Sequence, residues 1–212
     1  MQQIGRESQT TQRNSDVMPE EINAQKFAFL DIAKAIIPGF AIDESNKKII
    51  SNLFNYFLNI PGELELSKGL FVMGDIGTGK STLMQIFSKF KIFKNDGFLI
   101  HDCAHVANQY SINGDLDKYT YNVNGYCGNP VDMCFDELGR ESIPANHFGQ
   151  KLNVMQHILH IRYSLWQQKG LRTFITTNLG PSQVGELYGD FVRDRCREMF
   201  NVIMMEGASR RK

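Results

Sequence analysis

Cysteine is scarce in this chain, and its placement excludes a disulfide framework. None of the cysteines forms a C-x-x-C pair, and the four of them stand at Cys103, Cys127, Cys134 and Cys196. This usage is typical of thiols that stay reduced in the cytosol. No apolar run approaches the roughly 20 residues of a membrane-spanning helix, and the polar segment 1–19 lacks the apolar centre of a signal peptide. We therefore expect a cytoplasmic protein that has no contact with a membrane.

The chain also lacks an excess of either charge. Lysine plus arginine number 23, and so do aspartate plus glutamate. A protein that grips duplex DNA by broad charge neutralisation is usually basic, so any contact with nucleic acid should be local or assembled from several subunits. Hydrophobic residues make up 42% of the 212 positions, which suffices for one compact α/β domain with a short extension.

What the sequence does contain is a complete phosphate-binding motif, G-x-x-x-x-G-K-[ST], at residues 74–81. An apolar run at 69–73 precedes it and a helical pattern follows at 82–87, so the motif has strand–turn–helix context rather than that of a simple glycine turn. Lys80 can reach the outer phosphates of a nucleotide, and the Ser81 hydroxyl can hold Mg²⁺. We predict binding of ATP with Mg²⁺, and the expected nucleotide contacts are Gly74, Asp75, Ile76, Gly77, Thr78, Gly79, Lys80, Ser81 and Thr82.

The residues before this motif predict a polar tail and two helices. The segment 1–19 is rich in Gln, Ser, Thr and Arg, which favours a flexible tail. Apolar spacing over 20–37 predicts an amphipathic helix ended by Pro38-Gly39, and Asp43 or Ser45 is expected to cap a second helix that runs to Phe57. We divide the chain into a tail (1–19), a helical extension (20–66) and an ATPase domain (67–212).

From residue 69 onward, segments typical of strands and of helices alternate. Strands are expected at 70–73, 97–101, 131–135, 172–177 and 201–205, with helices between them at 81–90, 104–110, 148–169 and 181–200. This alternation predicts a parallel sheet covered by helices, with ligand chemistry at the carboxyl ends of the strands. The segment 111–129 interrupts it with glycines, asparagines and several tyrosines. Those tyrosines either stack on nucleic-acid bases or pack half-buried in an ordinary surface loop.

Polar residues follow two of the apolar strands. Asp136 and Glu137 end the third strand, where a phosphate-loop protein places its second Mg²⁺ group and its general base. Asp136 would hold the metal and Glu137 would polarise the attacking water, and this pair favours hydrolysis over a kinase reaction. Asn178 ends the fourth strand, where its amide either orients the water or belongs to a simple turn.

Several arginines lie near the end of the chain, namely Arg193, Arg195, Arg197, Arg210 and Arg211. An arginine brought to the γ-phosphate of a neighbouring subunit would stabilise the charge of the transition state. The alternative for any one of them is a solvated charge on a helix surface.

These parts, in this order, resemble the DnaC/IstB branch of the AAA+ ATPases, which comprises bacterial and phage helicase loaders and their transposition-helper relatives. The resemblance covers about two-thirds of the chain, and it rests on Gly74–Ser81, Asp136-Glu137-Leu138-Gly139, Arg162-Tyr163, Thr176-Thr177-Asn178 and Gly189–Arg197. It implies a P-loop NTPase of RecA-like AAA+ type, which is an α/β fold: a three-layer αβα sandwich with a five-stranded parallel sheet and no substantial C-terminal lid.

The resemblance also assigns roles by position. It implies Lys80 and Ser81 as Walker A residues, Asp136 and Glu137 as the Walker B pair, Asn178 as the sensor-1 residue and Arg195 as the arginine finger. Either Arg210 or Arg211 would be the sensor-2 arginine.

For partners, the resemblance implies a homo-oligomer on single-stranded DNA that grips a replicative DnaB-type helicase through its N-terminal region. The helix at 20–37 is then either a minimal docking helix or a helix that packs on this protein's own sheet. The implied function is an ATPase that loads a helicase in DNA replication. Alternatives are an IstB-like transposition helper, an ATP-switched binding module with slow turnover, and a small-molecule kinase.

Two further clusters are expected to be structural. His101, Cys103 and His105 lie within five residues but span a change from strand to helix and have no evident fourth zinc ligand. His157 and His160 are three residues apart on a helix, where they would line its surface or a seam between helices.

Overall fold

The computed structural model describes residues 19–94, 96–125 and 128–210. Most of the predicted tail, Cys127 and the Arg211 alternative therefore lie outside the described residues. The elements, in chain order, are α1 (Pro19–Ile36), α2 (Lys47–Phe57), β1 (Gly69–Gly74), α3 (Lys80–Phe93), β2 (Leu99–Asp102), α4 (Cys103–Asn113), the 3₁₀ turn η1 (Asp117–Tyr119), β3 (Met133–Leu138), β4 (Ala145–His147), β5 (Gln150–Leu152), α5 (Val154–Lys169), β6 (Thr173–Thr177), α6 (Pro181–Tyr188), α7 (Asp190–Met199) and β7 (Phe200–Met205).

Five of the strands form one sheet in the order β2-β3-β6-β1-β7, and every neighbouring pair is parallel. This confirms the predicted five-stranded parallel sheet. The central strands β1 and β6 are buried on both faces, as expected for short apolar runs in a sheet covered by helices, whereas the edge strands β2 and β7 include exposed residues.

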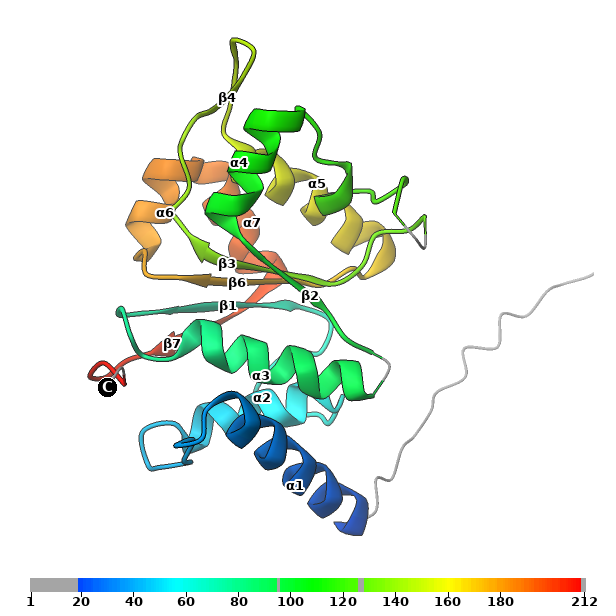
Figure 1. The fold of residues 1–212 in the computed structure, drawn as a ribbon, viewed down its shortest axis with the longest axis vertical. Helices are drawn as coiled ribbons and strands as arrows, with labels where there is room; N and C mark the ends of the chain where they lie inside the picture. Colours follow the sequence, from blue (N-terminus) through cyan, green and yellow to red (C-terminus); the bar gives the residue numbers. More distant parts are fainter. Residues whose placement is uncertain (1–18, 95, 126–127, 211–212) are drawn as a thin grey trace, which may run out of the picture.

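Helices cover the two faces of the sheet in separate groups (Figure 1). On one side lie α3 and α2, with α1 packed outside them; on the other lie α4, α5, α6 and α7. Alternate residues of β1 divide between two cores, since Leu70 and Val72 pack toward α2 and α3 whereas Phe71 and Met73 pack toward α4 and α5. None of the helices in the described ranges is long and apolar enough to cross a membrane.

The helix predicted over 20–37 packs on this protein's own structure. Phe29 and Ala33 of α1 are buried, and the Phe29 ring lies 4.9 Å from that of Phe87 on α3. Phe27, by contrast, is 69% exposed on the same helix. The apolar face of α1 therefore belongs to the core beneath the sheet, while the boundary at residue 66 stays a prediction.

The prediction of a helix from residue 148 is wrong at its start. Residues 145–152 form an antiparallel hairpin, β4–β5, whose two-residue turn is Phe148-Gly149. Both turn residues have positive φ, 45° and 92°, which matches the right-handed twist of a tight hairpin. Helix α5 begins only at Val154, because the Asn153 side chain accepts a hydrogen bond from the backbone N–H of Gln156 (3.2 Å) and caps it. The hairpin projects beyond the helices (Figure 1).

The single helix predicted over 181–200 is also wrong, because it breaks into α6 and α7. Gly189 lies between them at φ 86° and ψ 156°, a conformation that side-chain-bearing residues avoid. Likewise, neither Asp43 nor Ser45 caps the second helix, which begins after Asn46. The Asp43 carboxylate accepts the backbone N–H groups of Ser45 and Asn46 instead, and so shapes the turn before α2.

The tyrosines around segment 111–129 mostly pack inward. Tyr110 and Tyr119 are buried, and Tyr121 is half-exposed. The Tyr119 carbonyl accepts a hydrogen bond from the buried Arg162 of α5 (3.2 Å). Tyr126 lies outside the described residues. The two buried rings are therefore core residues rather than exposed stacking platforms.

Candidate nucleotide-binding site

A cavity of about 900 Å³ opens at the carboxyl ends of β1, β3 and β6. Such an edge of a parallel sheet is the expected place for a ligand. Four parts of the chain supply most of the lining residues. They are the extension between Ile37 and Ile50, the phosphate loop from Ile76 to Leu83, the segment Glu137–Arg140 and the segment Thr176–Leu179.

The phosphate loop runs from the end of β1 into α3. Gly79 stands just before the helix at φ 96°, so the chain turns sharply and α3 begins at Lys80 with its first N–H groups directed at the cavity. Gly77 is required for a different reason: a Cβ there would lie 2.2 Å from the Ser209 hydroxyl. The loop therefore presents its backbone to an anion and is covered from behind by the C-terminal segment.

Lys80 is 6% exposed, and its ammonium group is held by the loop itself. Nζ donates to the carbonyl oxygens of Gly74 and Asp75, each at 2.7 Å. Of the nine predicted nucleotide contacts, these two supply carbonyls to the lysine, and the seven from Ile76 to Thr82 line the cavity. This arrangement holds one positive charge where the outer phosphates of a nucleotide would lie.

Asp136 and Glu137 lie at an irregularity of β3. The register between β3 and β6 shifts between Phe135 and Leu138, and Glu137 has φ 58°. The Thr176 hydroxyl of β6 donates to the Asp136 carboxylate and accepts the Glu137 backbone N–H at 2.9 Å. In the sequence, Thr176 stands out only as part of the Thr176-Thr177-Asn178 motif and has no assigned role, because its contacts with both acidic residues depend on how β3 and β6 pair.

The Glu137 carboxylate is not free in this structure. Its Oε2 accepts a hydrogen bond from Nη1 of Arg140 at 2.6 Å, and the two side chains form an ion pair three residues apart. Arg140 is exposed and also lines the cavity. A general base at Glu137 must therefore share its carboxylate with this arginine.

The oxygen donors near the phosphate loop fit Mg²⁺. Mg²⁺ takes hard oxygen ligands and is commonly held by one or two protein groups together with phosphates and water. The Ser81 hydroxyl lines the cavity. Asp136 is not itself among the lining residues, but its half-buried carboxylate accepts a hydrogen bond from the hydroxyl of Thr176, which lines the cavity. These two groups are the residues that could hold the ion.

No group of three or more potential metal ligands gathers anywhere in the part of the chain that the structure describes. His101 packs edge-on against Tyr119, and burial lowers its pKa to about 4. Burial also raises the thiol pKa of Cys103 and of Cys134 well above the ordinary value. Neutral imidazole and neutral thiols inside the core agree with packing roles for these residues.

Asn178 follows β6 at the cavity, where it is exposed. The sheet therefore brings it to the same cavity as Lys80 and Glu137. The helical extension supplies a part of the cavity that sequence reasoning missed. Its apolar side chains there are those of Ile37, Phe40, Ala41, Ile49 and Ile50, and an apolar surface of this kind suits a flat aromatic base.

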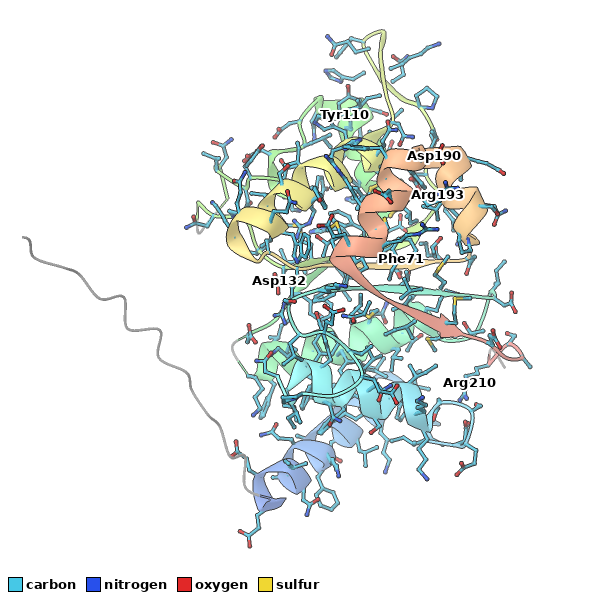
Figure 2. The ribbon with its side chains drawn as sticks, turned by 180° about the vertical axis from the view of Figure 1, so that it is seen from behind. Phe71, Tyr110, Asp132, Asp190, Arg193 and Arg210 are labelled. Carbon is cyan, nitrogen blue, oxygen red and sulfur yellow. The ribbon has the colours of Figure 1, made fainter. Side chains whose placement is uncertain are left out.

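Arg210 joins the cavity to the extension. Its backbone N–H donates to the Gly77 carbonyl at 2.8 Å, and its Nη2 donates to the Asp43 carboxylate at 3.0 Å and to the Ser45 hydroxyl. Figure 2 shows Arg210 at the end of the sheet, next to the loop between α1 and α2. The hydrogen bond from Arg210 holds the pKa of the Asp43 carboxyl well below its ordinary value. Of the two predicted sensor-2 arginines, Arg210 thus lines the cavity.

Arg195 does not line this cavity. It lies on α7, on the other side of the sheet, as do Asp190 and Arg193 in Figure 2. Its guanidinium group packs between the rings of Phe191 and Tyr163 and donates to His160. The structure therefore does not bring Arg195 together with the other predicted site residues of the same chain.

Several solved structures are similar to this chain in architecture. The DnaC helicase loader aligns with a TM-score of 0.57 at 17% identity, over 80% of this chain and 94% of that one. A putative primosome component from Streptococcus pyogenes aligns with a TM-score of 0.56 at 21% identity, over 80% and 84%. The replication initiator DnaA bound to AMPPCP and single-stranded DNA aligns at 0.52 and 16% identity, over 81% and 49%. No protein-family model and no curated protein sequence matches the chain.

The five-stranded parallel sheet and the phosphate loop give this chain the P-loop α/β fold of AAA+ proteins. Over most of its own length and most of theirs, this fold is similar to that of the DnaC helicase loader and of the primosome component. Both statements confirm the fold that the motifs predicted. At identities of 17–21% the likeness concerns the fold.

Proposed function

We propose that this protein binds and hydrolyses ATP at the cavity between the phosphate loop and the helical extension. Lys80 and the N-terminus of α3 would hold the phosphates, and the apolar side chains of the extension would hold the base. Mg²⁺, bound by Ser81 and Asp136, would neutralise charge on the transferred phosphoryl group. Glu137 would take a proton from the attacking water, and Asn178 would orient that water.

The observation that carries this proposal is the meeting of Lys80, Glu137 and Asn178 at one cavity from three different strand ends. A glycine turn that only joined a strand to a helix would need no acidic pair and no polar residue at the neighbouring strand ends. A small-molecule kinase would need no glutamate next to the metal aspartate.

The decisive variant is Glu137→Gln, which keeps the shape of the side chain and removes its basicity. We expect ATP affinity to persist and the hydrolysis rate to fall by about 10²–10⁴-fold. Lys80→Ala should instead abolish ATP binding, and Lys169→Ala, an exposed change at the far end of α5, should alter neither. A Glu137→Gln protein that hydrolyses ATP at the normal rate would refute the assignment of the base.

We further propose that the protein acts in DNA replication as a helicase loader, in which ATP drives assembly of a homo-oligomer on single-stranded DNA. The expected partner is a replicative DnaB-type helicase. This rests on the fold shared with the DnaC helicase loader and on the position of Arg195, which lies away from its own cavity, so that a catalytic role for it would require the cavity of another subunit.

The test is the ATP hydrolysis rate per subunit as a function of protein concentration, with and without a single-stranded DNA oligonucleotide. A rate that rises with concentration and rises further with DNA supports a site shared between subunits. A rate independent of both would point to a monomeric enzyme and would overturn the loader proposal.

One contact favours a second candidate, a module in which ATP is held as an assembly switch with slow turnover, as in an IstB-like transposition helper. The ion pair between Arg140 and Glu137 occupies the general base. If Glu137→Gln leaves the function in cells intact, hydrolysis is not the output and this second candidate is correct.

A further inference from the structure

Arg195 is held in a defined place on the surface of its own subunit. Its guanidinium carbon lies 3.5 Å from the ring centre of Phe191 on α7 and 4.3 Å from that of Tyr163 on α5. Stacking between two rings restricts a side chain that would otherwise lose much rotamer freedom on binding a ligand. The Tyr163 ring is in turn fixed by its hydroxyl, which donates to Glu198 at 2.5 Å.

His160 further restricts the orientation of the Arg195 guanidinium group. Nη1 of Arg195 lies 2.8 Å from Nδ1 of His160, and the His160 ring packs on Phe191 with ring centres 5.0 Å apart. A guanidinium group only donates hydrogen bonds, so Nδ1 must accept, and the imidazole must be neutral with its proton on Nε2. The neighbouring charge therefore favours one protonation state of His160.

The contact uses one edge of the guanidinium group and leaves the rest open. Of the nitrogen atoms of the Arg195 guanidinium group, only Nη1 has a hydrogen-bond partner among the described residues. Nε and Nη2 therefore remain as donors. Two parallel donors of this kind match the geometry of a phosphate group. Arg195 is thus oriented by its own subunit and still able to bind an anion from outside it.

We propose that His160 is a positioning residue for Arg195, holding the guanidinium group in the orientation in which it reaches the nucleotide of a neighbouring subunit. This rests on the proposed function, in which Arg195 acts between subunits. Neutral His160 accepts from Arg195; protonated His160 repels it. The approach of the Arg195 guanidinium group to the ATP of the neighbouring subunit then depends on pH through the protonation state of His160.

The surroundings of His160 make the neutral form dominant. Burial, the charge of Arg195 and the nearby His157 all lower the pKa of His160 below its ordinary value. Cys196 of α7 lines the same small void, and burial raises its pKa to about 12, so it stays uncharged. Asp194 and Glu198 of α7 act on the adjacent Tyr163. We therefore expect the contact to hold at neutral pH and to fail only at a pH lower than that at which an ordinary imidazole is protonated.

The test is complementation between two inactive variants. Arg195→Ala subunits keep an intact cavity and lack the arginine, whereas Glu137→Gln subunits keep the arginine and lack the base. Mixed, they should regain hydrolysis, because an Arg195→Ala cavity then meets an intact arginine. Adding His160→Ala to the Glu137→Gln subunit should lower the regained rate by about 10- to 100-fold, as expected when a reacting group is misplaced.

Matched variants separate positioning from folding. His160→Ala placed instead in the Arg195→Ala subunit should have no effect, since that subunit supplies no arginine. His157→Gln, one turn away on α5 and exposed, should leave the regained rate at neutral pH unchanged in either subunit. His160→Gln in the Glu137→Gln subunit keeps an acceptor that does not titrate, so the regained rate should persist and lose its decline in acid.

Two results would overturn the inference, and they differ. If the two single variants do not complement each other, Arg195 is not an intersubunit arginine, and the proposed shared site fails with it. If they do complement and His160→Ala in the Glu137→Gln subunit changes neither the rate nor its pH profile, the shared site stands and His160 does not position the arginine.

Discussion

Replacing Arg162 by alanine should lower the free energy of unfolding by about 5 kcal/mol. Arg162 is completely buried on α5, and no carboxylate within the described ranges hydrogen-bonds its guanidinium group. Its donors instead reach four neutral acceptors, which are Thr173 Oγ1 at 2.7 Å and the carbonyl oxygens of Tyr119 at 3.2 Å and of Val131 and Arg172 at 3.0 Å. The group ties the beginnings of β3 and β6 to η1.

The magnitude follows from two opposing terms. Leaving four buried acceptors without donors costs about 2 kcal/mol each. Removing the buried charge gives some of this back: burial lowers the pKa of Arg162 from 12.5 to about 10, and at 1.36 kcal/mol per unit that is roughly 3 kcal/mol. The difference between roughly 8 kcal/mol lost and roughly 3 kcal/mol recovered is about 5 kcal/mol.

Urea unfolding followed by circular dichroism measures this directly, with Lys169→Ala as the control on the same helix. The control should lose less than about 1 kcal/mol, because Lys169 is exposed in the last turn. ATP affinity of the folded Arg162→Ala protein should be nearly unchanged, since Arg162 acts at the amino ends of β3 and β6 and the cavity lies at their carboxyl ends. A loss below about 1 kcal/mol for Arg162→Ala would refute the network as a source of stability.

Three further variants test other contacts. Arg140→Ala frees Glu137 from an exposed ion pair of at most about 1 kcal/mol, so ATP hydrolysis should rise up to about 5-fold; a slower rate would mean that Arg140 assists catalysis. Asp43→Asn removes a competitor for Arg210, so calorimetry should show tighter ATP binding, and an unchanged Kd would indicate no competition. The pKa of His101 is about 4 in the folded protein and near 6.5 in the unfolded chain, so the free energy of unfolding should fall as the pH drops from 6.5 to 4. His101→Phe should remove this dependence of stability on pH, and a dependence that the substitution leaves unchanged would contradict the prediction.

The parts of this structure that depend on local pattern could be predicted from the sequence. The phosphate loop, the five strands and the order of strand and helix follow from glycine spacing and from short apolar runs, which are properties of neighbouring residues. The two wrong helices failed for a local reason as well. Phe148-Gly149 is a hairpin turn whose first residue has positive φ without being glycine or asparagine, so the usual turn signal is missing. An isolated glycine such as Gly189 occurs inside many helices and is therefore no certain sign of a break.

The contacts within the site could not be predicted in this way, because they depend on tertiary structure. Thr176 meets Asp136 only through the register of β3 and β6. The apolar end of the cavity arises because α1 and α2 fold back beneath the sheet. Asp43 and Arg210 are 167 residues apart in the chain and form a pair across the mouth of the cavity. Neither composition nor spacing carries such information.

The arginines illustrate why residue type alone does not assign a role. The guanidinium group of Arg162 donates to buried neutral acceptors. Arg210 forms an ion pair with Asp43, and Arg193 forms one with Asp190. An anion from a neighbouring subunit would have to break those contacts. Arg195 differs, because its partners are two rings and an imidazole, which fix its direction without neutralising its charge. An oriented guanidinium group that keeps its full charge fits the proposed phosphate contact between subunits, and this physical distinction separates Arg195 from Arg162, Arg193 and Arg210.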